Sequence, residues 1–162
     1  MPDDGTSGTT AATGPDAAAP EDAALQEALA AAYAAIWGYG VVGAAVPPET
    51  RPAVATAEQA HRDVRDELLT LLSSRDVQPV SAEAAYDLRF PVLSAVDAAA
   101  LAVTLEEGAA TAWTWVLDQA AERGTRELAV AALTATELRA VVWRAQAGRT
   151  PVTTALPGLP TS

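Results

Sequence analysis

Glutamates and a single histidine lie on or beside the apolar faces of two predicted helical stretches of the chain. Glu58 and His61 are three residues apart in one stretch, and Glu106 and Glu107 lie in another. His61 falls on the predicted apolar face of its helix, so its imidazole is expected to point into the protein. Carboxylates and imidazoles that project into a helical bundle are typical ligands of carboxylate-bridged iron or manganese centres. The candidate metal ligands are therefore Glu58, His61, Glu106 and Glu107.

The neighbouring helices offer no matching ligands at the same level. The expected turns place Glu58 and His61 opposite residues 32–36, which contain no carboxylate or imidazole, and place the two adjacent glutamates opposite valines 141–142. A di-iron site needs one Glu from each of two helices and Glu-x-x-His from each of the other two, so about half of the set is present. We expect an internal polar cluster of paired charges, with a single metal ion completed by water as the alternative.

Four amphipathic stretches must position these residues, and none of the chain alternates in the manner of a strand. We predict helices over residues 21–44, 50–74, 94–123 and 125–147. Residues 75–93 form a connection long enough to cross the bundle, so the third helix need not run antiparallel to the second. The predicted core face of the last helix comprises Leu128, Ala131, Ala132, Ala135, Leu138, Val141 and Val142.

Composition divides the chain into three parts. Residues 1–20 are rich in Gly, Ser, Thr, Ala, Pro and Asp, and we predict a disordered acidic tail there. Residues 21–150 form the helical bundle. Residues 151–162 form a Pro-rich tail, whose Leu156 and Leu159 would be the side chains to dock on the bundle.

The charge of the chain limits its partners. The formal net charge is −11, and all basic residues are arginines. Nucleic acid and anionic membrane both attract basic surfaces, so we expect neither as a partner. The first ten residues are acidic and lack an apolar stretch, so we predict no signal peptide. We also predict no transmembrane helix, and a cytoplasmic protein.

Several short motifs, taken in order, resemble the DUF4439 family, a ferritin-like domain of unknown function from actinobacteria. They are the run Ile36–Gly43 (IWGYGVVG), Glu58 with His61, Phe90-Pro91-Val92, Glu106-Glu107-Gly108 and Leu156–Pro160 (LPGLP). The resemblance covers about residues 21–160. It implies an all-α, ferritin-like four-helix bundle with a long crossover between the second and third helices, and it implies no established activity. The family often has a Glu-His pair where Ala32-Tyr33 stands here, which puts a complete metal site in doubt.

Few features favour an enzyme. The chain has no Cys, no GxSxG motif and no phosphate-binding Gly loop, and its one His has no matched Ser, so we assign no catalytic residue. Tyr33 and Trp37 are four residues apart and would either pack in the core or line a small-ligand cavity. Trp113 and Trp115 point to opposite sides of their helix, so one of them is expected under the crossover or at a dimer contact.

These observations lead to one hypothesis and two alternatives. The chain is expected to be a non-enzymatic helical domain with a metal-free polar centre and no cofactor, which acts through a homodimer or another protein partner. The first alternative is an iron- or manganese-binding redox or iron-handling protein that uses Glu58, His61 and Glu106 or Glu107. The second is a small-ligand binder at Tyr33 and Trp37.

Overall fold

The computed structural model describes residues 15–159, which form four long helices and one short 3-10 turn. The elements are α1 (Pro15–Ala45), η1 (Pro48–Thr50), α2 (Arg51–Ser74), α3 (Ala95–Gln119) and α4 (Arg123–Gln146). No strand occurs within this described range. The predicted all-α four-helix bundle is confirmed.

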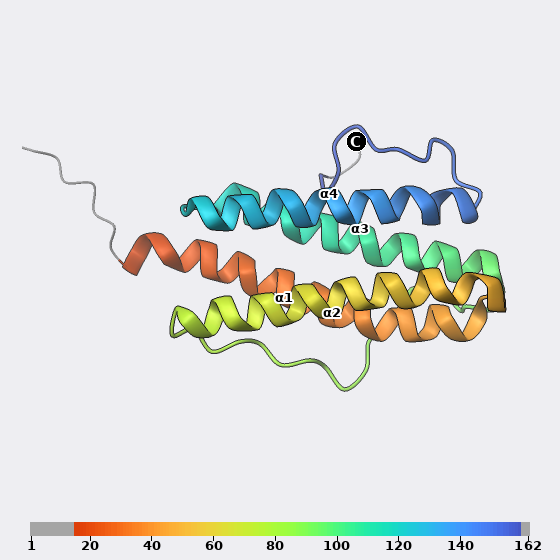
Figure 1. The fold of residues 1–162 in the computed structure, drawn as a ribbon, viewed down its shortest axis with the longest axis horizontal. Helices are drawn as coiled ribbons and strands as arrows, with labels where there is room; N and C mark the ends of the chain where they lie inside the picture. Colours follow the sequence, from red (N-terminus) through yellow and green to blue (C-terminus); the bar gives the residue numbers. More distant parts are fainter. Residues whose placement is uncertain (1–14, 160–162) are drawn as a thin grey trace, which may run out of the picture.

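Helix α1 is central to the arrangement (Figure 1). It packs closely against both α2 and α3, and α3 packs in turn against α4. The segment between α2 and α3 runs back along the outside of the bundle, so α3 starts at the same end as α2 (Figure 1). The backbones of α2 and α4 do not pack closely against each other within the described residues. The side of the bundle between α2 and α4 is therefore held together by side-chain contacts and not by close approach of the two helix backbones.

The N-terminal boundary of α1 differs from the prediction. The helix begins at Pro15, whereas we expected disorder up to residue 20. The alanines at 17–19 favour a helix, and the fixed φ of Pro20 is compatible with one near its beginning. Residues 1–14, the remainder of the predicted tail, lie outside the described residues.

By length and composition alone, residues 19–45 of α1 are apolar enough to cross a membrane. This differs from our expectation of no such helix. The central position of α1 also accounts for its apolar composition, because the helix packs against neighbours on two sides. Leu25, Leu29, Tyr39 and Val42 are all fully buried in the bundle.

The two ends of α3 are set by side chains. At its start, the Ser94 hydroxyl accepts the Asp97 N–H (3.1 Å), and the Asp97 carboxylate accepts the Leu93 N–H (3.1 Å), an arrangement close to a capping box. The helix ends at Gln119 instead of Arg123, because Ala120 is extended and the next two N–H groups bond to the carboxylate of Glu21. Helix α4 consequently starts two residues earlier than predicted.

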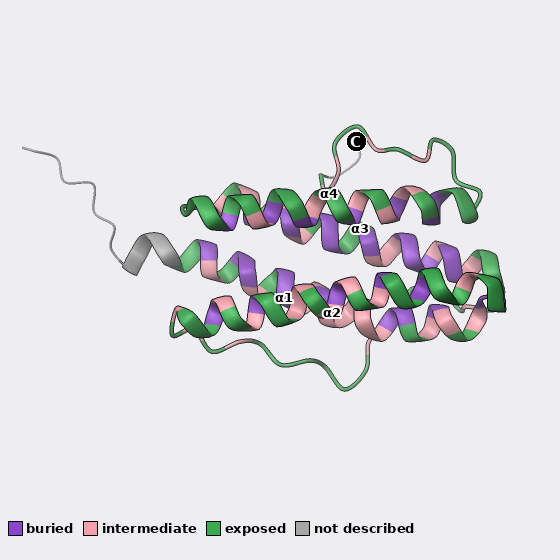
Figure 2. Cartoon of the chain, viewed as in Figure 1, coloured by how far each residue is buried: buried purple, intermediate pink, exposed green. Residues whose placement is uncertain are grey.

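Helix α4 buries a different face from the predicted one (Figure 2). Its core residues are Ala129, Ala132, Thr136, Ala140 and Trp143, with Thr125 and Arg144 also buried. Of the predicted core face, only Ala132 is buried. Leu138 and Val142 are 67% and 51% exposed. The sequence of α4 has two apolar faces, and periodicity alone does not say which one packs inward.

The C-terminal segment folds back onto α3 and α4. Thr114 donates a hydrogen bond to the carbonyl of Pro157 (3.1 Å), and Arg144 donates one to the carbonyl of Val152 (3.3 Å). The predicted docking leucines, Leu156 and Leu159, are instead largely exposed. Backbone groups, rather than leucine side chains, therefore attach this segment.

Gly158 makes the closest approach of this segment to the bundle. It has a φ of 77°, and a Cβ at this position would overlap the carbonyl oxygen of Ala110 and the hydroxyl of Thr114. A side chain here is strained and has no room, so the residue must be glycine.

We predict that Gly158→Ala detaches the C-terminal segment from α3 while the four helices stay folded. Amide hydrogen exchange and limited proteolysis of residues 150–159 should both accelerate. The control is Gly40→Ala in α1, where nothing lies near a new Cβ, and which should stabilise the protein by up to about 1 kcal/mol. Unchanged exchange in the Gly158 variant would contradict the prediction.

Candidate functional site

A buried carboxylate lies at the centre of the bundle. Glu106 of α3 is fully buried, and its Oε1 is approached by one side chain from each of the other three helices. The Tyr39 hydroxyl donates to it at 2.5 Å, Arg139 Nε donates at 3.0 Å, and His61 Nε2 lies at 3.1 Å. We call these four residues the Glu106 cluster.

The charges of the cluster are mutually compensated. Burial raises the pKa of Glu106, but the hydrogen bond and charge of His61, together with Arg139, outweigh it and hold the pKa below its ordinary value. Burial and the charge of Glu106 raise the pKa of Tyr39, so its hydroxyl stays protonated and can donate. Because Glu106 is a carboxylate acceptor, we assign the proton on His61 to Nε2. The centre is therefore a carboxylate surrounded by donors.

The structure brings together only two of the four predicted ligands. His61 and Glu106 meet, whereas Glu58 is partly exposed and pairs with Arg62 one helical turn away. Glu107 is 46% exposed and pairs with Arg144 and Arg149. Consecutive helical residues point about 100° apart, so Glu107 points away from the position that Glu106 occupies. This corrects the expectation that Glu58 and His61 meet with one or both of the adjacent glutamates, because only His61 and Glu106 meet.

The residues of the cluster do not fit a di-iron centre. Such a centre needs several carboxylates and imidazoles around the metal ions, and among residues 15–159 no group of three or more His, Cys, Asp or Glu side chains converges. The Arg139 guanidinium also lies 3.0 Å from the carboxylate, where a cation would have to bind. One carboxylate oxygen, Glu106 Oε2, is buried without a hydrogen-bond partner, and one oxygen does not make a di-iron site.

Sequence reasoning missed Tyr39 and Arg139. A tyrosine on a buried face usually needs a partner for its hydroxyl, which is a signal for a buried acceptor nearby. Arg139 is close to Glu106 because α4 is shifted by about one turn from the predicted pairing.

The aromatic pair on α1 does not share a cavity. Trp37 packs against Tyr86 of the crossover, with ring centroids 5.7 Å apart, beside a pocket of about 180 Å³ that Tyr33 does not line. Tyr33 instead packs against the core cluster nearer the other end of the bundle. Trp113 is buried and Trp115 is 40% exposed, so the predicted opposite orientation of these two side chains is observed.

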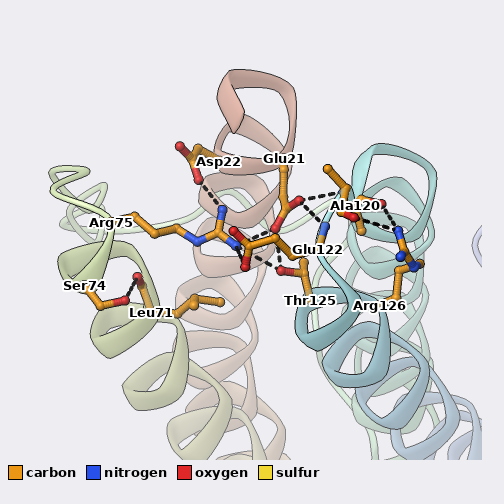
Figure 3. Close-up of polar contacts among 10 residues, drawn as sticks. Glu21, Asp22, Leu71, Ser74, Arg75, Ala120, Glu122, Thr125 and Arg126 are labelled. Atoms are coloured by element: carbon orange, nitrogen blue, oxygen red, sulfur yellow. Dashed lines mark hydrogen bonds and ion pairs between the residues drawn. The ribbon is translucent and has the colours of Figure 1, made fainter. Parts of the chain in front are cut away.

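A second buried carboxylate ties the far end of the bundle together (Figure 3). Glu21 of α1 is buried and accepts the N–H groups of Ala121 (2.6 Å) and Glu122 (3.0 Å) in the turn between α3 and α4. It also bonds to the hydroxyl of Thr125 and to the guanidinium of Arg75 at the end of α2. We call this group the Glu21 cluster. The sequence analysis did not anticipate it.

The Glu21 carboxylate is stabilised in its charged form. Burial raises its pKa, but hydrogen bonds from Thr125, the Glu122 backbone, Arg75 and the Ala121 backbone outweigh burial and hold the pKa below its ordinary value of 4.5. The same contacts keep the pKa of Arg75 above its ordinary range despite its burial. The cluster is thus an ion pair reinforced by backbone donors.

Comparisons with known proteins agree with the motifs. The model of a family described as "Domain of unknown function (DUF4439)" matches residues 24–161. The structure is similar to that of a conserved hypothetical protein from Mycobacterium tuberculosis, with 41% sequence identity and a TM-score of 0.77. This similarity covers 82% of the chain and 98% of the other protein. No curated protein matches the chain.

We predict that Glu106→Gln destabilises the protein by about 3 kcal/mol, because it leaves the Arg139 guanidinium without its buried counter-charge. Tyr39→Phe removes one donor to the same oxygen and should lose about 2 kcal/mol. Urea unfolding followed by circular dichroism measures both. Glu107→Gln is the control and should change stability by no more than about 1 kcal/mol. A Glu106 variant as stable as wild type would show that the cluster is not structural.

We predict that the stabilising effect of Glu21 depends on pH. Its pKa is lower in the folded than in the unfolded state, so its stabilisation is complete above about pH 4.5 and is lost as the pH falls below that value. Glu21→Gln should therefore lose about 2 kcal/mol relative to wild type at neutral pH, and the difference should shrink well below pH 4.5. Glu27→Gln, an exposed change in the same helix, is the control. A difference that grows on acidification would contradict this assignment.

Proposed function

Because the chain belongs to the DUF4439 family, whose description names no function, we propose a role from its own chemistry. The protein is a non-enzymatic helical domain. Its buried polar centre holds the bundle together, and its outer surface contacts another protein chain. We further propose that it acts in the cytoplasm, without a cofactor and without nucleic acid or membrane as a partner, since its net charge of −11 opposes binding to anionic phosphates.

The observation that carries this proposal is that Glu106 Oε1 already accepts hydrogen bonds from side chains of the protein itself. Three donors from three helices already converge on this atom, so the most reactive group in the bundle centre is engaged in internal hydrogen bonds. A metal ligand or a general base needs a free lone pair directed at the ion or the substrate. An engaged carboxylate instead fixes the relative positions of the helices.

The proposed contact with another chain is supported by the outer face of α4, which points away from the core. On one face of α4, the apolar side chains of Leu138 and Val142 are more than half exposed. Apolar side chains that are grouped on an outer surface commonly mark sites of protein contact. The polar centre thus supports a role in bundle stability, and the apolar outer face supports a role in protein contact.

The alternative function is metal binding by His61 and Glu106. The buried Glu106 Oε2 favours it, because this oxygen lacks a hydrogen-bond partner. Iron or manganese held there would have to displace Arg139 from the carboxylate and recruit Glu58 or Glu107 by a rotation of their side chains. The engaged Oε1 makes the structural role the better supported of the two.

Metal analysis tests the proposal. Tag-free protein from cells grown with added iron and manganese should contain either metal at far below one equivalent per chain, by plasma mass spectrometry. His61→Ala should leave that content unchanged and lower stability by about 2 kcal/mol, through the loss of a hydrogen bond to a buried charge. Near-stoichiometric metal that disappears in the His61 variant would overturn the proposal and establish the alternative.

A further inference from the structure

The exposed face of α4 has the spacing of a helix-pairing seam. Its members are Leu128, Ala131, Ala135, Leu138 and Val142, which repeat alternately at three or four residues; we call them the α4 seam. Leu128 is partly buried and the other four are exposed. Apolar residues at this alternating spacing average one per 3.5 residues, which is the period with which one helix packs along another. The seam therefore fits a helix as its partner.

A hollow lies on each side of the seam. One, of about 370 Å³, is bounded by α4 and the C-terminal segment at Thr153 and Pro157. The other, of about 310 Å³, is bounded by α4 and by Ala53 and Thr56 of α2. Leu138 lines both hollows, so it forms a ridge between two grooves, the shape into which the side chains of a second helix pack.

We propose that the α4 seam binds the same seam of a second copy of this chain, with the two α4 helices antiparallel. A two-fold axis at the level of Leu133 places Ala131 opposite Ala135 of the partner, and Leu128 opposite Leu138 of the partner. Small residues then meet at the axis, where the backbones approach most closely, and large residues meet at each side. The seam is thus complementary to itself, as a two-fold contact requires.

The charge distribution favours this helix as the self-contact. Helix α4 has four arginines and two glutamates, in a chain whose net charge is −11. Residues 128–136 contain no charged side chain, and the proposed axis lies in this run. The two copies of Arg139 are about 18 Å apart along the helices, which exceeds the screening length of about 8 Å at physiological salt.

The neighbouring surfaces enlarge the contact beyond the seam itself. A specific interface takes about 800 Å² from each partner, and the chain exposes 9598 Å². The α4 seam alone offers less area than such an interface. A partner helix lying on the seam also reaches the α2 and C-terminal walls of the two hollows, and these walls complete the contact.

The molar mass in solution tests the inference, which rests on the proposed function because it names the partner chain. Light scattering and sedimentation velocity should give twice the 16.6 kDa chain mass for the wild type over the micromolar to submillimolar range. Leu138→Glu, which places a charge on the ridge, should restore the monomer mass. Val130→Glu is the matched control, because Val130 is 55% exposed on the same helix but lies off the seam. This variant should remain dimeric, and circular dichroism should show both variants folded.

The chain has no cysteine, so engineered ones report the direction of pairing. A mixture of the Leu128→Cys and Leu138→Cys proteins should form a mixed disulfide dimer under mild oxidation. Neither protein should form disulfide dimers alone, because the two copies of either residue are about 15 Å apart along antiparallel helices. Cross-linking of each protein with itself would show parallel pairing and overturn the proposed geometry.

Two results of the mass measurement would overturn the inference. A monomeric wild type would exclude a second copy as the partner, and a dimer that survives Leu138→Glu would place the contact elsewhere. Either result leaves open the proposed function, which depends separately on the metal analysis. Stoichiometric metal lost in the His61 variant would overturn the proposed function, even if the α4 dimer were observed.

Discussion

The burial of one carboxylate constrains the whole bundle. A charged Glu106 in the protein interior is tolerated only if donors surround it, because an unpaired buried charge is strongly destabilising. Those donors are Tyr39, His61 and Arg139, one from each of the other helices. A helix that slid or rotated by one residue would withdraw its donor. The cluster therefore selects one relative position for all four helices.

This selection is needed because the rest of the core is permissive. Much of the buried surface consists of alanines, such as Ala98, Ala102 and Ala109 of α3, which are small and similar in shape. Alanine-rich faces allow helices to approach closely but distinguish poorly between neighbouring registers. At Gly38 of α1, a specific contact does restrict the packing. The side chain of Leu105 in α3 lies 2.7 Å from the position that a Cβ would take, so a larger residue does not fit there. Buried polar groups can specify one packing where apolar contacts are degenerate, and here they link all four helices.

Local features of the sequence could be predicted, and features set by distant residues could not. Pro47 and Pro48 end α1 close to the expected place, and Ser94 caps α3, because turn and cap chemistry act within a few residues. The end of α3 is different, since it depends on Glu21, about 100 residues away. No local pattern contains that information. The His61–Glu106 contact could be anticipated from two polar residues on apolar faces. The contact of Arg139 with Glu106 could not, because it depends on the position of α4 along α3, which the sequence does not give.

The apolar face of α4 shows a different limit. The face with the better periodicity, through Leu138 and Val142, was predicted to be the core, but the helix packs inward with Ala129, Ala140 and Trp143. Periodicity detects an apolar face without saying what covers it. A helix with two such faces needs a second neighbour, or leaves apolar surface in water.

The two polar clusters explain how the bundle remains intact along its open side. The backbones of α2 and α4 are not closely packed, yet His61 and Arg139 meet at Glu106, and Arg75 and Thr125 meet at Glu21. Each carboxylate comes from a third helix and binds one group from α2 and one from α4 or its start. Two buried anions thus link α2 to α4 at separate levels, where a fourth apolar interface would otherwise do so. Because these links are internal, they leave the apolar outer face of α4 exposed, with Leu138 and Val142 more than half accessible to solvent.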